Sequence, residues 1–558
     1  MALQTSAPLA DPAPVRATSY AARLQADPRG RRVPGSLPVF AFAVLVGTAA
    51  SIYTVRSGTN LDYGDAMAHL TIARRVVDNK APGLAQLGTV WLPLPHLLLM
   101  PLVQDMWLFR TGVAGCIVST LCLGASATAL WRTTARLELD VLARLVALLV
   151  LLANLSLLYV STTALTEPVL IAAMLGTIAG VAGWCRSHRQ LSGGELAVFA
   201  GIPAAAGVLT RYEAWPLVIS ALVVVVVASR RRGSSWRRSG RYGLALAAPS
   251  MLAASWWLAY NTAVYGTPVE FLTGQYSAAA FTQVYLDNGL LATKGNAGLS
   301  FAVLGWALLE TAGLVALVAA GIGLLLMTWH WGLEDRALIV WMAASSTAFL
   351  LFSLTTGQHI MVNDKSLPTG AYNNRYVLSA IPWLALLAAV GVHHVVRRAP
   401  QVRMLLAAVL LVAVTAQNVW WLQAPTAHMT VIEEAHDQHV AYTRIKAAAT
   451  WLRTHYDGGG ILMDQTPDKS SLAPVLGIRI DEFFTRASGP VFQEAIDDPH
   501  AHARWVFMHR RQVTSSATET GRDLVTRALA KDPQFHARYR LVYAIADIGI
   551  YRRLEEWP

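Results

Sequence analysis

The sequence contains few charged residues and very few cysteines. Charged side chains make up 14% of the 558 residues and hydrophobic ones 54%, whereas about a quarter of a soluble globular chain is charged. This balance argues against a cytosolic enzyme and against a disordered chain. Three cysteines are present, Cys116, Cys122 and Cys185, and each lies in or beside an apolar stretch. We therefore expect inert, packed thiols in an integral membrane protein and not a disulfide scaffold.

Long apolar stretches recur along the first 422 residues. A bilayer core about 30 Å thick requires roughly 20 apolar helical residues, because backbone polar groups must be satisfied within the segment. We expect eleven spans, near residues 36–56, 108–131, 141–159, 163–184, 195–210, 213–229, 241–261, 299–328, 337–356, 376–396 and 402–422. The predicted fold class is a polytopic α-helical membrane protein.

The basic residues are distributed unevenly between the loops. The N-terminal stretch and every second loop after it together carry 20 of the 45 Lys and Arg residues, and the short loops between them carry few. The positive-inside rule then predicts a cytoplasmic N-terminus in the plasma (inner) membrane, and an odd number of spans predicts an extracytoplasmic C-terminus. The net charge of +11 is thus mostly a topology signal, and we expect no nucleic-acid partner.

Three kinds of segment flank the spans. Residues 1–35 are rich in Ala, Pro and Arg and predict a disordered cytoplasmic tail before a transmembrane domain at 36–422. We expect outer loops at 57–107, 262–298 and 357–375. Residues 423–558 predict a small extracytoplasmic α/β domain, with a helix over His439–His455 and strand-like runs at Ile461–Met463, Trp505–Met508 and Leu541–Tyr551.

The first outer loop carries acidic residues next to a predicted helix. Asp62 and Asp65 flank a Tyr-Gly turn, and His69 follows Asp65 by four residues, so it shares the same helical face. The apolar residues after Asp65 fit a short amphipathic helix along the membrane surface. Asp65 is then either the cap of that helix or a carboxylate that deprotonates a hydroxyl or binds a divalent cation. A metal site would consist of Asp62, Asp65 and His69, with Mg²⁺ or Mn²⁺ as the ion.

The stretch Asp65-Ala-Met-Ala-His-Leu-Thr-Ile-Ala-Arg74 resembles the first outer-loop motif of the GT-C membrane glycosyltransferases that use polyprenyl-phosphate sugars. It is similar to the aminoarabinose-transferase and protein O-mannosyltransferase type, also called glycosyltransferase family 39-like. Asp65 matches the first acid of a D-E-x-x-Y-A-x-I-A-R pattern, and Ile72-Ala73-Arg74 match its end. Ala66 stands where the second acid is expected, and His69 replaces the Tyr.

Other short motifs follow in the order found in that superfamily. They are Glu167-Pro168 at the start of the fourth span, Thr210-Arg211-Tyr212-Glu213, Tyr260-Asn261 through Tyr265-Gly266-Thr267-Pro268, Arg375-Tyr376 through Pro382, and the C-terminal Tyr539–Tyr543 with Ile550–Arg552. Charge bias alone already places Asp62, Asp65, Glu167, Arg211, Glu213, Lys365 and Arg375 on the outer side. Polar groups near hydrocarbon are costly unless they face a cavity or a partner, so this gathering predicts a site at the outer boundary.

The resemblance implies a glycosyltransferase that moves one sugar from a polyprenyl-phosphate donor to an extracytoplasmic glycan, lipid or protein, with inversion. Asp65 is expected to be the general base, with Asp62 assisting it. Arg211, Lys365 and Arg375 are candidates for binding the donor phosphate. Trp91, His96 and Tyr276 are candidates for contacts with the sugar or the acceptor.

Two other functions are compatible with a polytopic chain. A transporter or lipid flippase would place charged residues near mid-membrane and show repeat symmetry, whereas polar groups here gather at one boundary. A non-catalytic subunit could present lipid to a partner enzyme.

Overall fold

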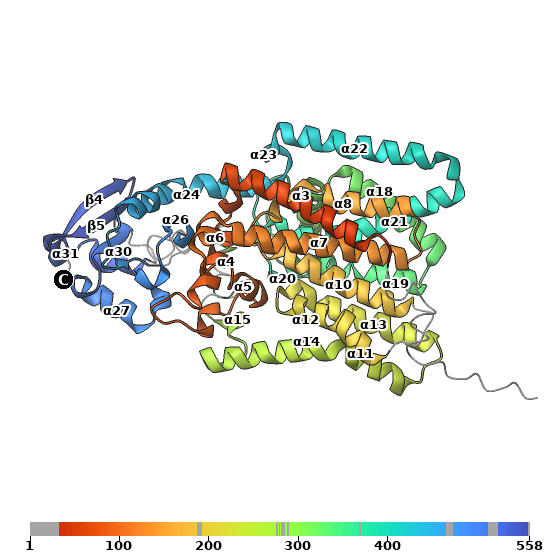
Figure 1. The fold of residues 1–558 in the computed structure, drawn as a ribbon, viewed down its shortest axis with the longest axis horizontal. Coiled ribbons are helices and arrows are strands. Elements are labelled where there is room, and N and C mark those ends of the chain that lie inside the picture. Colours follow the sequence, from red (N-terminus) through yellow and green to blue (C-terminus); the bar gives the residue numbers. More distant parts are fainter. Residues whose placement is uncertain are drawn as a thin grey trace, which may run out of the picture.

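The structure is a computed structural model that describes residues 33–186, 192–274, 277, 280, 285–286, 290–367, 370–464, 472–511 and 523–555. A bundle of helices forms one end of the molecule and a β-sheet with short helices forms the other (Figure 1). Within these residues, seven helices are long and apolar enough to cross a membrane, or eight when one bent pair is counted as a span.

The helices of the bundle follow the predicted stretches. The long apolar ones are α3 (Ser36–Ser57), α7 (Val113–Arg136), α10 (Glu167–Cys185), α13 (Trp215–Arg231), α18 (Leu314–Trp331), α21 (Ile381–Arg398) and α22 (Arg403–Gln423), and the bent pair is α19 (Asp335–Met342) with α20 (Ser345–Thr356). They are joined in the bundle by α8 (Val141–Leu152), α9 (Leu155–Val160), α11 (Gly193–Leu196), the π-helix η3 (Ala197–Gly201), α12 (Ile202–Val208), α14 (Trp236–Tyr265) and α17 (Ala297–Ala312).

Four of the predicted stretches are interrupted, and one of them, 108–131, divides at Gly112 between α6 (Met106–Thr111) and α7. The stretch 141–159 divides into α8 and α9, the stretch 299–328 divides into α17 and α18 at Gly313, and 337–356 bends by 43° between α19 and α20. Gly313 has a φ of 84°, which is incompatible with a continuous helix. Hydropathy does not register such breaks, because the residues on both sides are equally apolar.

Amide side chains satisfy the backbone groups that two of these breaks release. Asn154 Nδ2 donates to the carbonyl of Thr311 (2.8 Å), and Asn418 Nδ2 of α22 donates to the carbonyl of Ala153 (2.8 Å). The adjacent Gln417 accepts from the backbone N–H of Val315 (3.2 Å). Such partners are what makes broken helices tolerable in an apolar surrounding.

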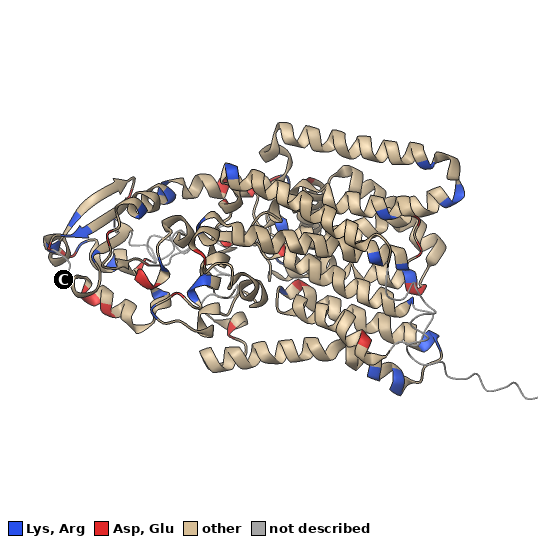
Figure 2. Ribbon diagram, in the orientation of Figure 1, with Lys and Arg blue, Asp and Glu red and all other residues tan. Residues whose placement is uncertain are grey.

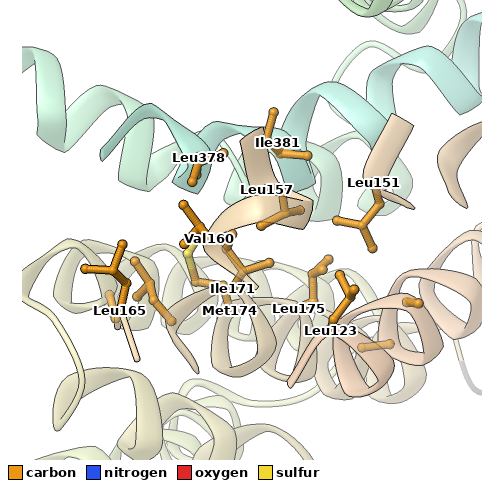
Figure 3. Close-up of a cluster of buried hydrophobic side chains, with 14 of the residues drawn as sticks. Leu123, Leu151, Leu157, Val160, Leu165, Ile171, Met174, Leu175, Leu378 and Ile381 are labelled. Carbon is orange, nitrogen blue, oxygen red and sulfur yellow. The ribbon is translucent and has the colours of Figure 1, made fainter. Parts of the chain in front are cut away.

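The core of the bundle lies where α7, α8, α9, α10 and the start of α21 meet. Figure 3 shows Leu123, Leu151, Leu157, Val160, Leu165, Ile171, Met174, Leu175, Leu378 and Ile381 packed together there. Small residues let other helices approach closely: a Cβ on Gly323 of α18 would lie 1.8 Å from the carbonyl oxygen of Leu387 in α21. Close packing of this kind is typical of membrane helices.

The segments around the end of the bundle nearer the sheet are short. They are η1 (Thr59–Leu61), α4 (Gly64–Arg75), η2 (Leu84–Leu87), α5 (Leu94–Leu99), α6 (Met106–Thr111), η4 (Tyr212–Ala214), α15 (Glu270–Thr273), η5 (Asn374–Ala380) and α23 (Pro425–His428), while η6 (Pro400–Val402) joins α21 to α22. The long helix α24 (Thr430–His455) then runs from the bundle to the sheet (Figure 1).

The C-terminal sheet has five strands in the order β2-β1-β3-β5-β4. The strands are β1 (Ile461–Leu462), β2 (Phe483–Phe484), β3 (Trp505–His509), β4 (Tyr539–Ile545) and β5 (Ile548–Arg553). β1 is parallel to β2 and β3, and β5 is antiparallel to β3 and β4. The run Leu541–Tyr551, expected as one strand-like segment, is therefore a hairpin.

Both faces of the sheet are covered. One face packs against α24 in the same core as the bundle, and the other forms a separate core with α27 (Pro490–Asp497), α30 (Leu524–Leu529) and α31 (Pro533–Arg538). The remaining short helices are α26 (Ala473–Leu476), η7 (Ile480–Glu482), η8 (Arg486–Ser488) and α28 (Pro499–His502). The sheet is thus joined to the bundle through α24.

Candidate active site

The helix α4, which carries Asp65, is buried on almost all sides. Every residue from Ala66 to Arg74 is buried, so the expectation of an amphipathic helix lying along the membrane surface is wrong. Tyr63 occupies the N-cap position and makes no side-chain cap bond, while Asp65 lies in the first turn. Asp65 therefore does not cap the helix, although it lies near the positive end of the helix dipole.

Arg375 is the centre of the polar groups at this end of the bundle. Its Nη2 donates to Asp65, its Nε to Glu167 Oε1 (3.1 Å) and its Nη1 to Glu434 Oε1 (3.4 Å). The ring of Tyr63 lies 4.9 Å from its guanidinium carbon. One guanidinium thus connects three carboxylates from α4, α10 and α24.

Arg211 extends the same arrangement. Its Nη1 donates to Glu167 Oε1 (3.1 Å), so that oxygen bridges the two arginines, and its Nη2 donates to Glu213 (2.7 Å). The ring of Tyr376 lies 4.5 Å from the guanidinium carbon. We refer to Asp65, Glu167, Arg211, Glu213, Arg375 and Glu434 as the central cluster.

Accessibility differs sharply within the central cluster. The side chain of Asp65 is 39% exposed, whereas that of Arg375 is 3% exposed and those of Glu167 and Glu434 are similarly buried. Four carboxylates surround two guanidiniums, so the cluster has no excess of positive charge. Asp65 is the carboxylate of this cluster that a substrate can reach most easily.

Glu434 was not identified from the sequence. It lies in α24, in the polar segment after the last span, where hydropathy places no residue next to the bundle. Burial raises the pKa of Glu434 to about 7, against the lowering effect of the adjacent Arg375. In the sequence, the adjacent acids Glu433 and Glu434 could have indicated this residue as a candidate, but such pairs usually lie on solvated helix faces.

The metal site predicted from Asp62, Asp65 and His69 is not assembled. Asp62 Oδ1 accepts from His439 Nδ1 (2.6 Å), Asp65 pairs with Arg375, and His69 bonds His96. Burial raises the pKa of Asp62, although His439 opposes this effect. In the part of the chain that the structure describes, no group of three or more His, Cys, Asp or Glu residues is arranged to hold a metal ion.

His69, His96 and Trp91 form a second group beside the central cluster. The two imidazoles are hydrogen-bonded between His69 Nδ1 and His96 Nε2 (2.8 Å), and the ring of Trp91 lies 4.6 Å from that of His69. Burial, with the charges of Arg375 and Arg211, lowers the pKa of His69 to about 3, and burial also lowers that of His96. Both rings are therefore neutral at physiological pH, and Trp91 is 36% exposed.

Two other residues predicted to contact the substrate, Lys365 and Tyr276, are not part of these two groups. Lys365 is 43% exposed and pairs with Asp364 (2.7 Å) and more distantly with Glu310 (3.8 Å). Tyr276 lies outside the described residues.

The Tyr260-Asn261 motif of α14 holds the first outer loop. Tyr260 Oη donates to the carbonyls of Gly88 (3.0 Å) and Leu84 (3.2 Å), and Asn261 accepts from the hydroxyl of Thr89. This motif therefore positions the segment that leads to Trp91.

Comparisons with known proteins support the architecture. No family model matches the sequence, and no curated protein matches it. ArnT from Cupriavidus metallidurans in the apo state is similar in structure, with a TM-score of 0.54 and 13% sequence identity, covering 91% of this chain and 97% of that chain. An oligosaccharyltransferase from Archaeoglobus fulgidus, tethered with an acceptor peptide, aligns with a TM-score of 0.44 and 12% sequence identity. The alignment covers 91% of this chain and 72% of that chain. The chain has the fold of the GT-C membrane glycosyltransferases, which confirms at the level of the fold the resemblance seen in its sequence.

Proposed function

We propose that the chain is a membrane glycosyltransferase that transfers a single sugar from a polyprenyl-phosphate donor to an extracytoplasmic glycan, lipid or protein. The observation that carries the proposal is the position of Asp65. Its carboxylate is bound to a buried arginine on one side and is accessible on the other. A general base needs both properties, because it must stay ionised and must reach the acceptor.

In the proposed reaction, Asp65 removes the proton of an acceptor hydroxyl while the hydroxyl oxygen attacks the anomeric carbon of the donor sugar. The bond from the acceptor oxygen to that carbon forms as the bond from the carbon to the phosphate oxygen breaks. Polyprenyl phosphate leaves with the electron pair. A single displacement of this kind inverts the anomeric configuration.

Arg375 supports Asp65 in this scheme. An ion pair favours the charged carboxylate, and a buried guanidinium fixes its orientation. Because three carboxylates already occupy its Nε, Nη1 and Nη2, Arg375 is better placed to orient Asp65 than to bind the donor phosphate alone. Lys365, which is 43% exposed, is the other proposed phosphate contact. Arg211 was a further candidate, but Glu167 and Glu213 occupy its guanidinium in the same way.

Trp91, His69 and His96 form the proposed sugar subsite. The apolar face of a sugar ring packs on an exposed aromatic ring such as that of Trp91. The buried His69 packs against this ring and bonds His96, so the two imidazoles support the subsite from within the protein. The proposed subsite is compatible with a hexose, a pentose or an aminosugar as the donor sugar.

The distribution of charge supports the proposed orientation. Lys and Arg are numerous at the end of the bundle that lies opposite the sheet (Figure 2). By the positive-inside rule this end is cytoplasmic, which places the central cluster and the sheet outside and fits a donor that arrives already attached to lipid.

Reconstitution of the purified chain tests the function. Proteoliposomes containing polyprenyl-phosphate sugars and a panel of acceptors are expected to release polyprenyl phosphate and glycosylated acceptor in equal amounts. Nucleotide sugars in the same vesicles should not act as donors. Movement of the carrier lipid between leaflets without any sugar transfer would refute the proposal and favour a flippase.

A further inference from the structure

One face of α24 holds the segment that contains Asp65. Tyr63 Oη donates to the backbone carbonyl of Val431 (2.8 Å), and the backbone N–H of Gly64 donates to Gln438 Oε1 (2.9 Å). The ring of Tyr442 lies so close to Gly64 that a Cβ there would be 3.1 Å from it. Val431, Gln438 and Tyr442 are seven and four residues apart in α24, so they lie on one stripe along the helix.

The bond from Gly64 to Gln438 provides a cap for α4. The first N–H groups of an α-helix have no partner within the helix, and Tyr63 at the N-cap position contributes no side-chain bond. Gln438, on another helix and 374 residues away in the chain, accepts from the first residue of α4. Asp65 is the next residue, so its backbone position depends on this contact.

The same stripe also reaches the partner of Asp65. Glu434 Oε1 accepts from Arg375 Nη1 (3.4 Å), Glu434 Oε2 accepts from Tyr63 Oη (3.4 Å), and Gln438 Nε2 donates to Glu434 Oε1 (3.4 Å). Glu434 therefore bonds Arg375 directly, and Gln438 bonds both Glu434 and the residue that precedes Asp65.

The opposite end of α4 is held by the C-terminal segment as well. Asn79 Nδ2 and Gln86 Nε2 both donate to the carbonyl of Ala487 (2.9 Å each), and the N–H of Asp481 donates to Asp78 Oδ1 (3.1 Å). Farther along α24, Ile445, Ala448 and Leu452 belong to the same core as the strand residues Ile461, Trp505 and Ile550. Residues beyond the last span thus hold α4 at both of its ends.

We propose that Gln438 is a positioning residue for the transfer reaction and that α24 fixes the reactive placement of Asp65. The proposal rests on the function proposed above. It assigns to the C-terminal segment a part in the chemical step itself. A displacement of about 1 Å in a reacting group can cost about 100-fold in rate, so the loss of one cap is expected to be visible in kcat.

The test compares three variants of the full chain in proteoliposomes. Gln438→Met keeps the side-chain length and removes the acceptor for Gly64. Thr443→Val, at an exposed position of α24 whose hydroxyl bonds the carbonyl of His439 in the same helix, is the matched control. Asp65→Asn in the same assay tests whether Asp65 acts as the general base. Amide hydrogen exchange is followed in the peptide covering residues 60–66 and in the strands.

We expect Gln438→Met to lower kcat by about 10- to 100-fold with the KM for the donor changed by less than about twofold. Exchange should become faster in residues 60–66 and stay unchanged in the sheet, and Thr443→Val should match the parent chain. A kcat within about twofold of the parent would overturn the positioning role, and so would faster exchange throughout the chain, which indicates a purely structural loss. If the parent chain transfers no sugar, the proposed function fails, whatever Gln438→Met does. Normal turnover by Asp65→Asn would instead overturn Asp65 as the base, and with it the positioning role of Gln438.

Discussion

Arg375 and Asp65 form an ion pair although 310 residues separate them in the chain. The arginine lies in the first turn of η5, which leads into α21, and the aspartate lies in the first turn of α4, so the pair joins the first outer loop to a late span. Arg375 is buried and Asp65 is accessible. The pair therefore presents one oriented carboxylate at the outer end of the bundle.

Replacement of Arg375 should damage both activity and stability. Arg375→Gln leaves Glu167 and Glu434 buried without their shared cation, which costs about 3–5 kcal/mol, and it removes the partner of Asp65. Transfer should fall by about 100-fold or more. Arg375→Lys should rescue little, because the single nitrogen of an ammonium group cannot reproduce the separate Nε, Nη1 and Nη2 donors of the guanidinium.

Thermal unfolding in detergent and initial transfer rates measure these effects. Arg479→Gln is the matched control, because this arginine is 68% exposed and pairs with Asp481 at the surface. Equal unfolding midpoints for Arg375→Gln and Arg479→Gln would show that the central cluster is not a stabilising network.

Glu434 should make stability depend on pH. Its pKa is about 7 in the folded chain, above its usual value of 4.5, so the folded state binds more protons than the unfolded state between these two values. Stability from this group is present at acidic pH and is lost as pH rises towards 7. Glu434→Gln removes the titration.

The variant should therefore become more stable relative to the parent chain as the pH is raised from 5 to 8. Unfolding midpoints measured in parallel at these two pH values test this expectation. The midpoint of the variant minus that of the parent should therefore increase between pH 5 and pH 8. A value that stays constant or decreases would contradict the raised pKa of Glu434.

The exposed ring of Trp91 should contribute to substrate binding. Trp91→Ala is expected to raise the KM for the sugar substrate by about 5-fold, since one aromatic contact contributes roughly 1 kcal/mol, while Trp91→Phe should retain most of the affinity. Trp329→Ala, at a residue that is 84% exposed on α18, is the control. Unchanged KM values for both donor and acceptor in Trp91→Ala would remove Trp91 from the subsite.

The orientation of the chain can be tested by cysteine labelling in intact cells. A membrane-impermeant maleimide should label Thr454→Cys at the end of α24 without permeabilisation. It should label Arg237→Cys, at the opposite end of the bundle, only after permeabilisation. The parent chain is the background control, because it retains the buried Cys116 and Cys185 and the partly exposed Cys122. The reverse pattern would invert the proposed topology.

The sequence predicted that a set of polar residues gathers at one boundary of the bundle, because loop charge and hydropathy indicate the depth of a residue in the membrane. Asp65, Glu167, Arg211, Glu213 and Arg375 indeed lie in direct contact. Depth does not specify which of these groups pair within the plane of the membrane. The sequence predicted Arg375 as a contact for the donor phosphate. Its pairing with Asp65 could be seen only in the structure.

Features that depend on long-range packing were beyond prediction. Glu434 and Gln438 follow the last span, in a segment where no apolar pattern restricts their position. The burial of α4 also follows from packing, since its sequence alone resembles a helix at a membrane surface. The break at Gly313 is tolerated because Gln417 of a distant helix satisfies a backbone N–H beside it.

The most direct measurement is the transfer of labelled sugar from a polyprenyl-phosphate donor by Asp65→Asn, with Asp62→Asn beside it under identical conditions. If Asp65 is the base, Asp65→Asn loses transfer by about 1,000-fold or more while binding the donor as tightly as the parent chain, and Asp62→Asn keeps measurable turnover. Transfer by Asp65→Asn at a rate close to that of the parent chain would contradict the assignment.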